Sequence, residues 1–155
     1  MGLVRRLSHA VLYVRDVERS VGFYRQAFGF EEVARAGGGQ AAFLRAGGSA
    51  NHHDLGLFSV GPAAPVPARG SVGLYHLAWE VESISDLAAA RQVLQDLGAL
   101  VGQSDHGATK SLYGRDPDGN EFEVMWQVPR ERWGEYETSA PVLPLDLEAE
   151  LARYG

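Results

Sequence analysis

Residues 7–14 read Leu-Ser-His-Ala-Val-Leu-Tyr-Val, and residues 74–81 read Leu-Tyr-His-Leu-Ala-Trp-Glu-Val. Both stretches are rich in aliphatic and aromatic residues that favour strands, and both carry a histidine two positions after the first leucine. A turn and then a stretch with helical periodicity follow each of them. The chain therefore contains an internal repeat, and this repeat predicts the fold.

Each half of the chain contains one amphipathic helix. We expect the first helix over residues 17–28 and the second over residues 86–97. The residues that should share one stripe are Val17, Val21, Tyr24 and Phe28 in the first helix and Leu87, Ala90, Leu94 and Leu97 in the second. A glycine follows each helix, as is common after the last helical turn. Each helix should therefore pack one face on a sheet.

Short strands should follow each helix. They are expected at residues 31–36, 41–46 and 54–60 in the first half, and at residues 99–104, 111–115 and 121–127 in the second. The last two strands are joined by the turn Asp-Pro-Asp-Gly-Asn at residues 116–120. The predicted fold is α+β, with paired βαβββ modules that form a cup-shaped sheet around a metal site.

The expected domain covers residues 5–127. It consists of module one at residues 5–60, a proline-containing linker at residues 61–70 and module two at residues 71–127. Residues 128–155 form a C-terminal tail in which we expect a short helix capped by Asp146.

The composition excludes several classes of function. The chain has 155 residues, a net charge of −6 and no cysteine. The acidic balance does not fit a nucleic-acid-binding or membrane-surface protein, and the lack of cysteine excludes disulfides, zinc–thiolate sites and cysteine nucleophiles. Neither a membrane-spanning apolar run nor the apolar region of a signal peptide is present. We therefore expect a cytoplasmic protein that binds neither nucleic acid nor membranes.

Three side chains indicate a metal site. His9 and His76 hold the same position in the two repeats, and Glu123 should face away from its neighbours Phe122 and Val124. A carboxylate that faces a cup interior needs a partner. Two imidazoles and one carboxylate from separate strands make the set that leaves open positions on a non-haem Fe(II). The alternative is a pair of strand histidines satisfied in the core and an exposed carboxylate at a sheet edge.

The repeated module with His9, His76 and Glu123 resembles the vicinal oxygen chelate superfamily. That group includes glyoxalase I, metal-dependent fosfomycin-resistance enzymes, bleomycin-binding proteins and type I extradiol dioxygenases, and the resemblance covers residues 5–127. The segment from His106 to Glu123 is similar to the extradiol ring-cleavage signature and departs from it at Ser104. Many extradiol enzymes have four modules, so this chain resembles the small single-domain forms.

The resemblance implies roles for further residues. His9, His76 and Glu123 look like the metal ligands, for Fe(II) or for Mn(II). His53 looks like the acid–base catalyst, and it competes with its neighbour His52 because only one of the two can face the cup. His106 and Tyr113 look like hydrogen-bonding groups over the substrate. In the alternative readings, His106 bonds a loop carbonyl and Tyr113 is a core aromatic residue.

The implied reaction is extradiol ring cleavage. A catechol-type aromatic diol would be cleaved beside the diol by O₂, with both oxygen atoms incorporated, and an imidazole can remove and return the protons near neutral pH. The expected partners are therefore an aromatic diol, O₂ and a second copy of the chain in a homodimer. Lys110 and Arg115 are weaker candidates for contact with an acidic group of the substrate.

Other functions of the same fold remain open. Glyoxalase-like isomerisation would call for a fourth Glu or Gln ligand at the end of module one, where this chain offers His53. Fosfomycin-resistance enzymes share the three-ligand set, whereas metal-free drug-binding or aromatic-binding relatives lack it. The signature around His106 favours the dioxygenase.

Overall fold

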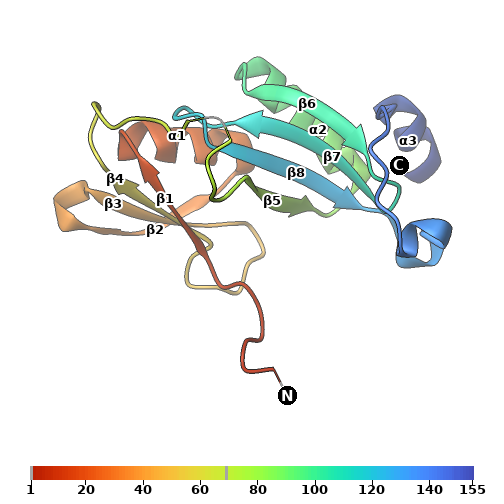
Figure 1. Cartoon of the computed structure of the whole chain (residues 1–155), viewed down its shortest axis with the longest axis horizontal. Coiled ribbons are helices and arrows are strands. Elements are labelled where there is room, and N and C mark those ends of the chain that lie inside the picture. Colours follow the sequence, from red (N-terminus) through yellow and green to blue (C-terminus); the bar gives the residue numbers. More distant parts are fainter. Residues whose placement is uncertain (1, 69) are drawn as a thin grey trace. The chain divides into compact units, whose positions relative to one another are not determined.

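The computed structural model describes residues 2–68 and 70–155, which fold as two compact units (Figure 1). Unit 1 comprises residues 2–68, and unit 2 comprises residues 70–155. Each unit contains a four-stranded sheet with both parallel and antiparallel strand pairs. The predicted α+β class and the paired βαβββ modules are confirmed. The cup, which requires both sheets, stays a prediction.

Unit 1 follows the predicted order of elements. They are β1 (Ala10–Val14), α1 (Val17–Phe28), β2 (Glu31–Ala36), β3 (Ala41–Arg45) and β4 (Leu55–Ser59). The strand order in the sheet is β1-β4-β3-β2, with β1 parallel to β4 and the other pairs antiparallel. A 3₁₀ turn at Gly37–Gly39 joins β2 to β3.

Helix α1 has clear signals at both of its ends. The Asp16 carboxylate accepts a hydrogen bond from the backbone N–H of Arg19 at 3.0 Å, which caps the first turn. Gly29 ends the helix with a φ of +67°, a conformation that favours glycine. Between these ends, the helix buries Val17 and Tyr24 against the sheet.

Unit 2 repeats the same topology and adds a C-terminal segment. Its elements are β5 (His76–Val81), α2 (Ile84–Asp96), β6 (Leu100–Asp105), β7 (Thr109–Arg115), β8 (Glu121–Gln127), two short 3₁₀ turns (Arg130–Arg132 and Gly134–Glu137) and α3 (Leu147–Tyr154). The strand order is β5-β8-β7-β6, with β5 parallel to β8. The predicted capping of α3 is confirmed, because the Asp146 carboxylate accepts from the Ala149 N–H at 3.1 Å.

Some element boundaries differ from the predicted ones. The first strand of each module was expected to start at residues 7 and 74, but β1 starts at Ala10 and β5 at His76. In unit 1, the Ala10 N–H donates to the Asp54 carbonyl oxygen at 3.0 Å, whereas residues 2–9 are exposed. Helix α2 starts at Ile84, earlier than expected, because the Ser83 hydroxyl caps it by accepting from the Asp86 N–H at 3.1 Å.

Helix α1 in unit 1 and helix α2 in unit 2 each cover one face of their sheet. In unit 1 this face buries Leu12, Leu44 and Leu57, and in unit 2 it buries Leu112, Phe122 and Val124. Because side chains alternate along a strand, the neighbouring residues point to the opposite face, which we call the open face. The predicted site residues in β5, β7 and β8 belong to the open face of unit 2. None of the helices described here is long and apolar enough to cross a membrane.

Candidate functional site

His76 and Glu123 form the polar centre of the open face of unit 2. His76 is the first residue of β5, and Glu123 lies on the adjacent parallel strand β8, in register with Ala78. The His76 Nε2 atom is 3.1 Å from the Glu123 Oε2 atom, and the two side chains are 24% and 13% exposed. Nδ1 of His76 is buried and has no hydrogen-bond partner among the described residues. One imidazole nitrogen and one carboxylate oxygen are therefore adjacent on this face, and both are atom types that can bind a metal ion.

Tyr113 extends this row onto β7. It is in register with Glu123 on the neighbouring strand, and its hydroxyl oxygen lies 2.7 Å from Nε2 of His106. Burial and the negative charge of Glu123 both raise the pKa of Tyr113. The phenol therefore keeps its proton near neutral pH and remains a hydrogen-bond donor.

His106 contacts Tyr113 on one side and the backbone on the other. Its Nδ1 atom is 2.7 Å from the carbonyl oxygen of Pro141 in the C-terminal tail, residues 128–155. The alternative reading from the sequence, in which His106 bonds a loop carbonyl, describes its Nδ1 contact, whereas its role as a hydrogen-bonding group over a substrate stays a prediction. Tyr113 is partly exposed and faces the open side rather than the core.

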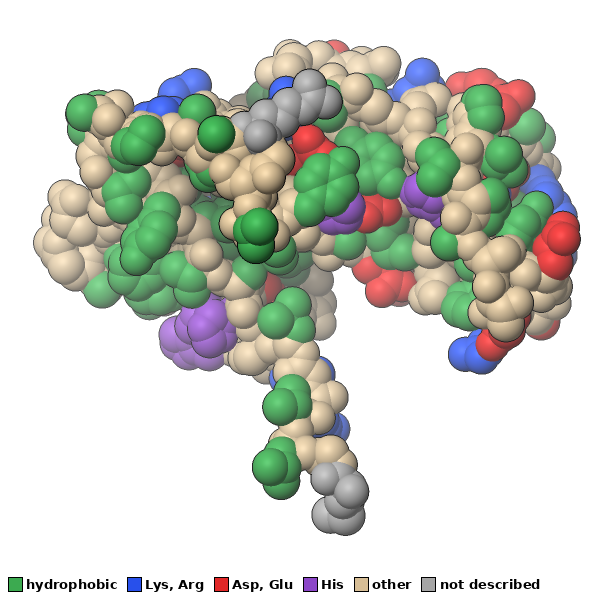
Figure 2. Space-filling view, in the orientation of Figure 1, with side chains coloured by type: hydrophobic (Ala, Val, Ile, Leu, Met, Phe, Trp, Pro, Cys, Tyr) green, Lys and Arg blue, Asp and Glu red, His purple; other side chains and the backbone are tan. Residues whose placement is uncertain are grey.

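Unit 1 gathers its own histidines, which Figure 2 shows as a purple cluster. The ring centroids of His9 and His53 are 4.4 Å apart, and the His53 ring also contacts Phe43 of the open face at 4.9 Å. Nδ1 of His52 lies 3.0 Å from Nδ1 of His53, but His52 itself is exposed. Of the two adjacent histidines, His53 is therefore the one that packs beside the sheet.

The environment of His53 disfavours its cationic form. Burial lowers the pKa of His53, and the nearby His9 and His52 lower it further when they are charged, whereas Asp54 acts in the opposite direction. His53 is thus held toward the neutral imidazole that can accept a proton.

Asp54 holds the loop that carries these histidines. Its carboxylate accepts hydrogen bonds from the Ala46 N–H at 2.9 Å, the Ser49 hydroxyl at 2.8 Å and the Asn51 amide at 2.6 Å. Burial raises the pKa of Asp54, but these hydrogen bonds outweigh it and the net shift is downward.

The structure brings the predicted residues together as two groups. His9 and His53 meet in unit 1, and His76, Tyr113, His106 and Glu123 meet in unit 2. Within the parts of the chain that the structure describes, no group of three or more histidine, aspartate and glutamate side chains is arranged to hold a metal ion. The complete set of His9, His76 and Glu123 thus draws on both units and stays a prediction.

Two weaker sequence interpretations change. Lys110 is buried on the helix side of the sheet, where Nζ lies 2.6 Å from Oδ1 of Asp105 and 3.5 Å from Oε2 of Glu150. Arg115 pairs with Glu121 at 3.4 Å. The suggestion that Lys110 contacts a substrate acid group is therefore wrong, because its charge is already neutralised inside unit 2.

Sequence reasoning missed the Pro141 carbonyl. A backbone oxygen carries no side-chain signal, and the contact joins residues that are far apart in the chain. The missed group nevertheless binds the ring of a predicted site residue.

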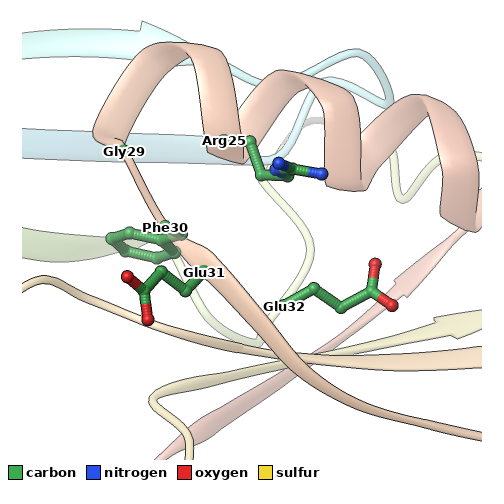
Figure 3. A pocket seen from close by; sticks show the side chains of 5 residues that line it. All are labelled: Arg25, Gly29, Phe30, Glu31 and Glu32. Atoms are coloured by element: carbon green, nitrogen blue, oxygen red, sulfur yellow. The ribbon is translucent and has the colours of Figure 1, made fainter.

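Unit 1 also contains a pocket (Figure 3). It has a volume of about 480 Å³ and is lined by Arg25, Gly29 and Phe30 at the end of α1 and by Glu31 and Glu32 of β2. Glu31 and Glu32 are already paired with Arg45 and Arg35. None of the predicted site residues lines this pocket.

Residues 6–124 match the model of the Glyoxalase/Bleomycin resistance protein/Dioxygenase superfamily. The chain belongs to this superfamily. The vicinal oxygen chelate resemblance proposed from the repeat is thus confirmed.

Among relatives in this superfamily, the catechol-2,3-dioxygenase of Bacillus subtilis is 34% identical over 82% of this chain and 43% of its own length. The manganese-dependent 2,3-dihydroxybiphenyl 1,2-dioxygenase of Geobacillus genomosp. 3 is 30% identical over 82% of this chain and 38% of its own length. The chain thus spans less than half of each of these two dioxygenases. The metallothiol transferase FosB of Shouchella clausii is 27% identical and matches 96% of this chain and 98% of its own length.

Solved structures of superfamily members share the fold. A glyoxylase/bleomycin resistance protein/dioxygenase domain from Frankia sp. EAN1pec has a TM-score of 0.65 at 25% identity, covering 81% of this chain and 99% of that domain. Lactoylglutathione lyase from Agrobacterium tumefaciens has a TM-score of 0.60 at 26% identity, covering 81% of this chain and 96% of the lyase. These similarities support the superfamily and leave several reaction types open.

Proposed function

We propose that this chain is an extradiol ring-cleaving dioxygenase that acts on a catechol-type aromatic diol. The observation that carries the proposal is the proximity of His76, Glu123 and Tyr113 on the open face of unit 2, where Tyr113 and Glu123 belong to the segment similar to the ring-cleavage signature. The similarity to two dioxygenases that act on aromatic diols supports it. The working unit is expected to be a homodimer.

The metal would be Fe(II) or Mn(II), held by His9, His76 and Glu123. The donor set fits such an ion, because the paired His76 and Glu123 supply a nitrogen and an oxygen within 3.1 Å of each other. When bound, the ion would supply adjacent positions for the two diol oxygens and for O₂. The protein groups around it would then manage the protons and the position of the ring.

His53 is assigned the role of general base and acid. With Nδ1 directed at His52, its Nε2 atom is the one to take a proton from a diol hydroxyl and to return it to the product. The Tyr113–His106 pair would hydrogen-bond a substrate oxygen where negative charge develops. The Phe43 ring beside His53 offers an apolar wall for a planar aromatic substrate.

The test is anaerobic loading of the full chain with Fe(II) or Mn(II), followed by oxygen uptake with a panel of catechols. A yellow ring-opened product is expected from the wild type, and His76→Ala should abolish it. His53→Ala should lower turnover strongly, whereas the matched variant His52→Ala, at the exposed neighbour, should retain it. Ring cleavage that survives His53→Ala would contradict the acid–base role.

A thiol transfer of the fosfomycin-resistance type is the second candidate. The observation that favours it is the match to FosB, which extends over nearly the full length of both chains. Metal binding without oxygen uptake on any catechol, together with consumption of fosfomycin and a thiol, would establish this second function. If the chain binds neither Fe(II) nor Mn(II), the result would indicate a metal-free protein that binds aromatic compounds.

A further inference from the structure

The loop between β6 and β7 is held by the C-terminal tail. Asp105 and Leu143 exchange two backbone hydrogen bonds of 2.9 Å each, and the Val128 N–H donates to the Ala108 carbonyl oxygen at 2.9 Å. Between these anchors, the Pro141 carbonyl oxygen lies 2.7 Å from Nδ1 of His106. The tail thus fixes the backbone on both sides of His106 and also contacts its ring.

The packing of the tail on this loop is tight. Gly107 has a φ of +77°, and a Cβ atom there would lie 2.3 Å from Cγ of Tyr136. The Tyr136 ring therefore rests directly on the backbone next to His106. Only glycine allows this approach.

The far end of the tail is itself anchored in unit 2. Leu145 and Leu147 are 6% and 4% exposed, and the Gln103 amide donates to the Leu145 carbonyl oxygen at 3.0 Å. Glu150 of α3 faces the buried ammonium of Lys110 at 3.5 Å. These contacts make the tail a fixed support rather than a loose end, so Pro141 is held in place.

The Pro141 contact decides which nitrogen of His106 carries the proton. A carbonyl oxygen can only accept a hydrogen bond, so Nδ1 must be the N–H donor. In the neutral ring, Nε2 is then a bare acceptor, and the Tyr113 hydroxyl at 2.7 Å donates to it. The opposite tautomer would reverse this bond, because an Nε2–H would donate to the phenol oxygen.

We propose that the C-terminal tail is a positioning element of the active site, and that the Pro141 carbonyl sets the tautomer of His106 and hence the direction of the Tyr113 hydrogen bond. The proposal rests on the function proposed above. In this state, the Tyr113 oxygen presents its lone pairs to the diol hydroxyl that His53 does not deprotonate. As the diol proton moves to the Tyr113 oxygen, the Tyr113 proton moves to Nε2 of His106. This leaves a negative diol oxygen, a neutral phenol that donates to it, and an imidazolium that donates to Pro141.

The experiment compares Leu143→Pro with Leu143→Ala in the full chain. Proline removes the N–H that donates to Asp105 and so loosens the tail beside Pro141, whereas alanine removes a similar part of a 46% exposed side chain and keeps that N–H. The ¹⁵N shifts of the His106 imidazole, measured without metal at a pH where the ring is neutral, report the tautomer directly. Wild type and Leu143→Ala should show Nδ1–H, and Leu143→Pro should show a mixture.

Turnover provides the second measurement. Leu143→Pro should lower kcat by about 10-fold with little change in KM, the size typical of losing a supporting hydrogen bond around a metal site. If Leu143→Pro does not fold, Tyr136→Ala takes its place, with Tyr136→Phe as the control that keeps the ring on Gly107. An unchanged tautomer, or a His106 that carries its proton on Nε2 in the wild type, would overturn the proposal.

The two proposals fail in different ways. Wild-type chain that shows the tail-dependent Nδ1–H tautomer but cleaves no catechol would leave the positioning contact in place and contradict the dioxygenase. Ring cleavage with the same kcat and tautomer in Leu143→Pro and Leu143→Ala would retain the dioxygenase and contradict the role of the tail.

Discussion

Units 1 and 2 share one topology but have different open faces. Across three neighbouring strands in register, unit 1 places Val11, Gly56 and Phe43, and unit 2 places Ala78, Glu123 and Tyr113. The position of the carboxylate in one unit is thus a glycine in the other, and the position of the phenol is a phenylalanine. The fold is repeated, whereas the polar chemistry of this row is present only in unit 2.

Packing explains why unit 1 has no carboxylate in this row. A Cβ atom on Gly56 would lie 3.3 Å from Cγ2 of Val11 and 3.6 Å from both Phe43 and Phe58. Aromatic side chains have filled the space that a glutamate would need. Tyr13, which shares this face with Val11, is 74% exposed. Figure 2 shows hydrophobic side chains in green at the surface of the molecule. Unit 1 therefore presents an apolar surface, and unit 2 presents the hydrogen-bonding groups.

The largest expected loss of metal binding and activity comes from removing Glu123, the carboxylate that the open face of unit 2 has and that of unit 1 lacks. Glu123→Ala gives unit 2 a small residue at this position, as in unit 1, and should weaken metal binding and ring cleavage by more than about 100-fold, because a direct ligand contributes more than an outer partner does. Calorimetric titration with Fe(II) under anaerobic conditions measures the loss.

The matched control is Glu121→Ala, on the same strand and face, where the carboxylate pairs with exposed Arg115. This variant should bind Fe(II) almost as well as the wild type. Equal weakening by the two substitutions would mean that general negative charge, rather than ligation by Glu123, holds the ion.

A smaller effect is expected from Tyr113→Phe, which copies Phe43 of unit 1 into unit 2. The variant loses one hydroxyl that bonds His106 at 2.7 Å, so kcat should fall by about 10- to 100-fold while the thermal unfolding temperature changes little. Steady-state kinetics with the best catechol of the panel provide the measurement. Tyr13→Phe, which removes a hydroxyl from a 74% exposed ring on the open face of unit 1, is the control and should leave kcat nearly unchanged. A fall in kcat equal to that of Tyr113→Phe would show that the effect is not specific to the Tyr113 hydroxyl.

The helix-facing rows of the two sheets make a third comparison. Unit 1 pairs Leu44 with Leu55, whereas unit 2 pairs Gly114 with Phe122 at the equivalent positions. A Cβ atom on Gly114 would lie 2.3 Å from Cζ of Phe122, so Gly114→Ala should lower the free energy of unfolding by about 1–3 kcal/mol. Urea denaturation measures this loss.

Combining Gly114→Ala with Phe122→Leu moves this pair toward the Leu44–Leu55 pair of unit 1, because volume is added on β7 and removed from β8. The double variant should therefore be less destabilised than the sum of the two single variants. Gly102→Ala serves as the control, because a Cβ there would make only an ordinary contact of 3.8 Å with Tyr113. If the losses of unfolding free energy in the two single variants add up to the loss in the double variant, the side chains at positions 114 and 122 do not compensate each other in volume, and the interpretation is wrong.

The smallest expected effect is a change in stability, and it concerns the aspartates that organise the segments before β4 and β8. Asp54 organises the loop before β4 in unit 1, and Asp116 organises the turn before β8 in unit 2 through hydrogen bonds from the Asp118 and Asn120 N–H groups at 2.9 Å each. Because hydrogen bonds lower the pKa of Asp54 in spite of its burial, its ionised form stabilises unit 1. This contribution is complete above the unfolded pKa of about 3.9 and is lost as the pH falls through the lower folded pKa.

Asp54→Asn tests this dependence. The variant should be less stable than the wild type by about 1 kcal/mol at neutral pH, and the difference should shrink as the pH falls below about 4. Urea unfolding at several pH values gives both curves. A difference between them that persists unchanged at low pH would show that the charge of Asp54 is not what stabilises the loop.

The sequence predicted the elements of the fold well, because their signals are local. Helix α1 covers the predicted residues, from the capping Asp16 to the terminating Gly29, and β2 and β8 match the predicted ranges. The predicted strand starts at residues 7 and 74 were less accurate, because the strands begin at Ala10 and His76. A strand begins where a partner strand offers hydrogen bonds. Composition does not reveal that partner.

The residue types of the candidate site were also within reach of the sequence. Repetition placed His9 and His76 at matching positions, and alternation along β8 put Glu123 on the face opposite Phe122. Three side chains of these types are enough to suggest a metal, since few other partners suit a carboxylate and two imidazoles.

Only the tertiary structure decided which groups meet. The 3.1 Å approach of His76 to Glu123 depends on the register between parallel strands, and a slip of one residue would turn Glu123 toward the helix. The tautomer of His106 depends on a backbone carbonyl of the tail, which any residue at position 141 would supply. Local sequence thus determined the elements and the chemical groups, whereas long-range pairing and packing determined their partners, because those energies arise between residues that are distant in the chain.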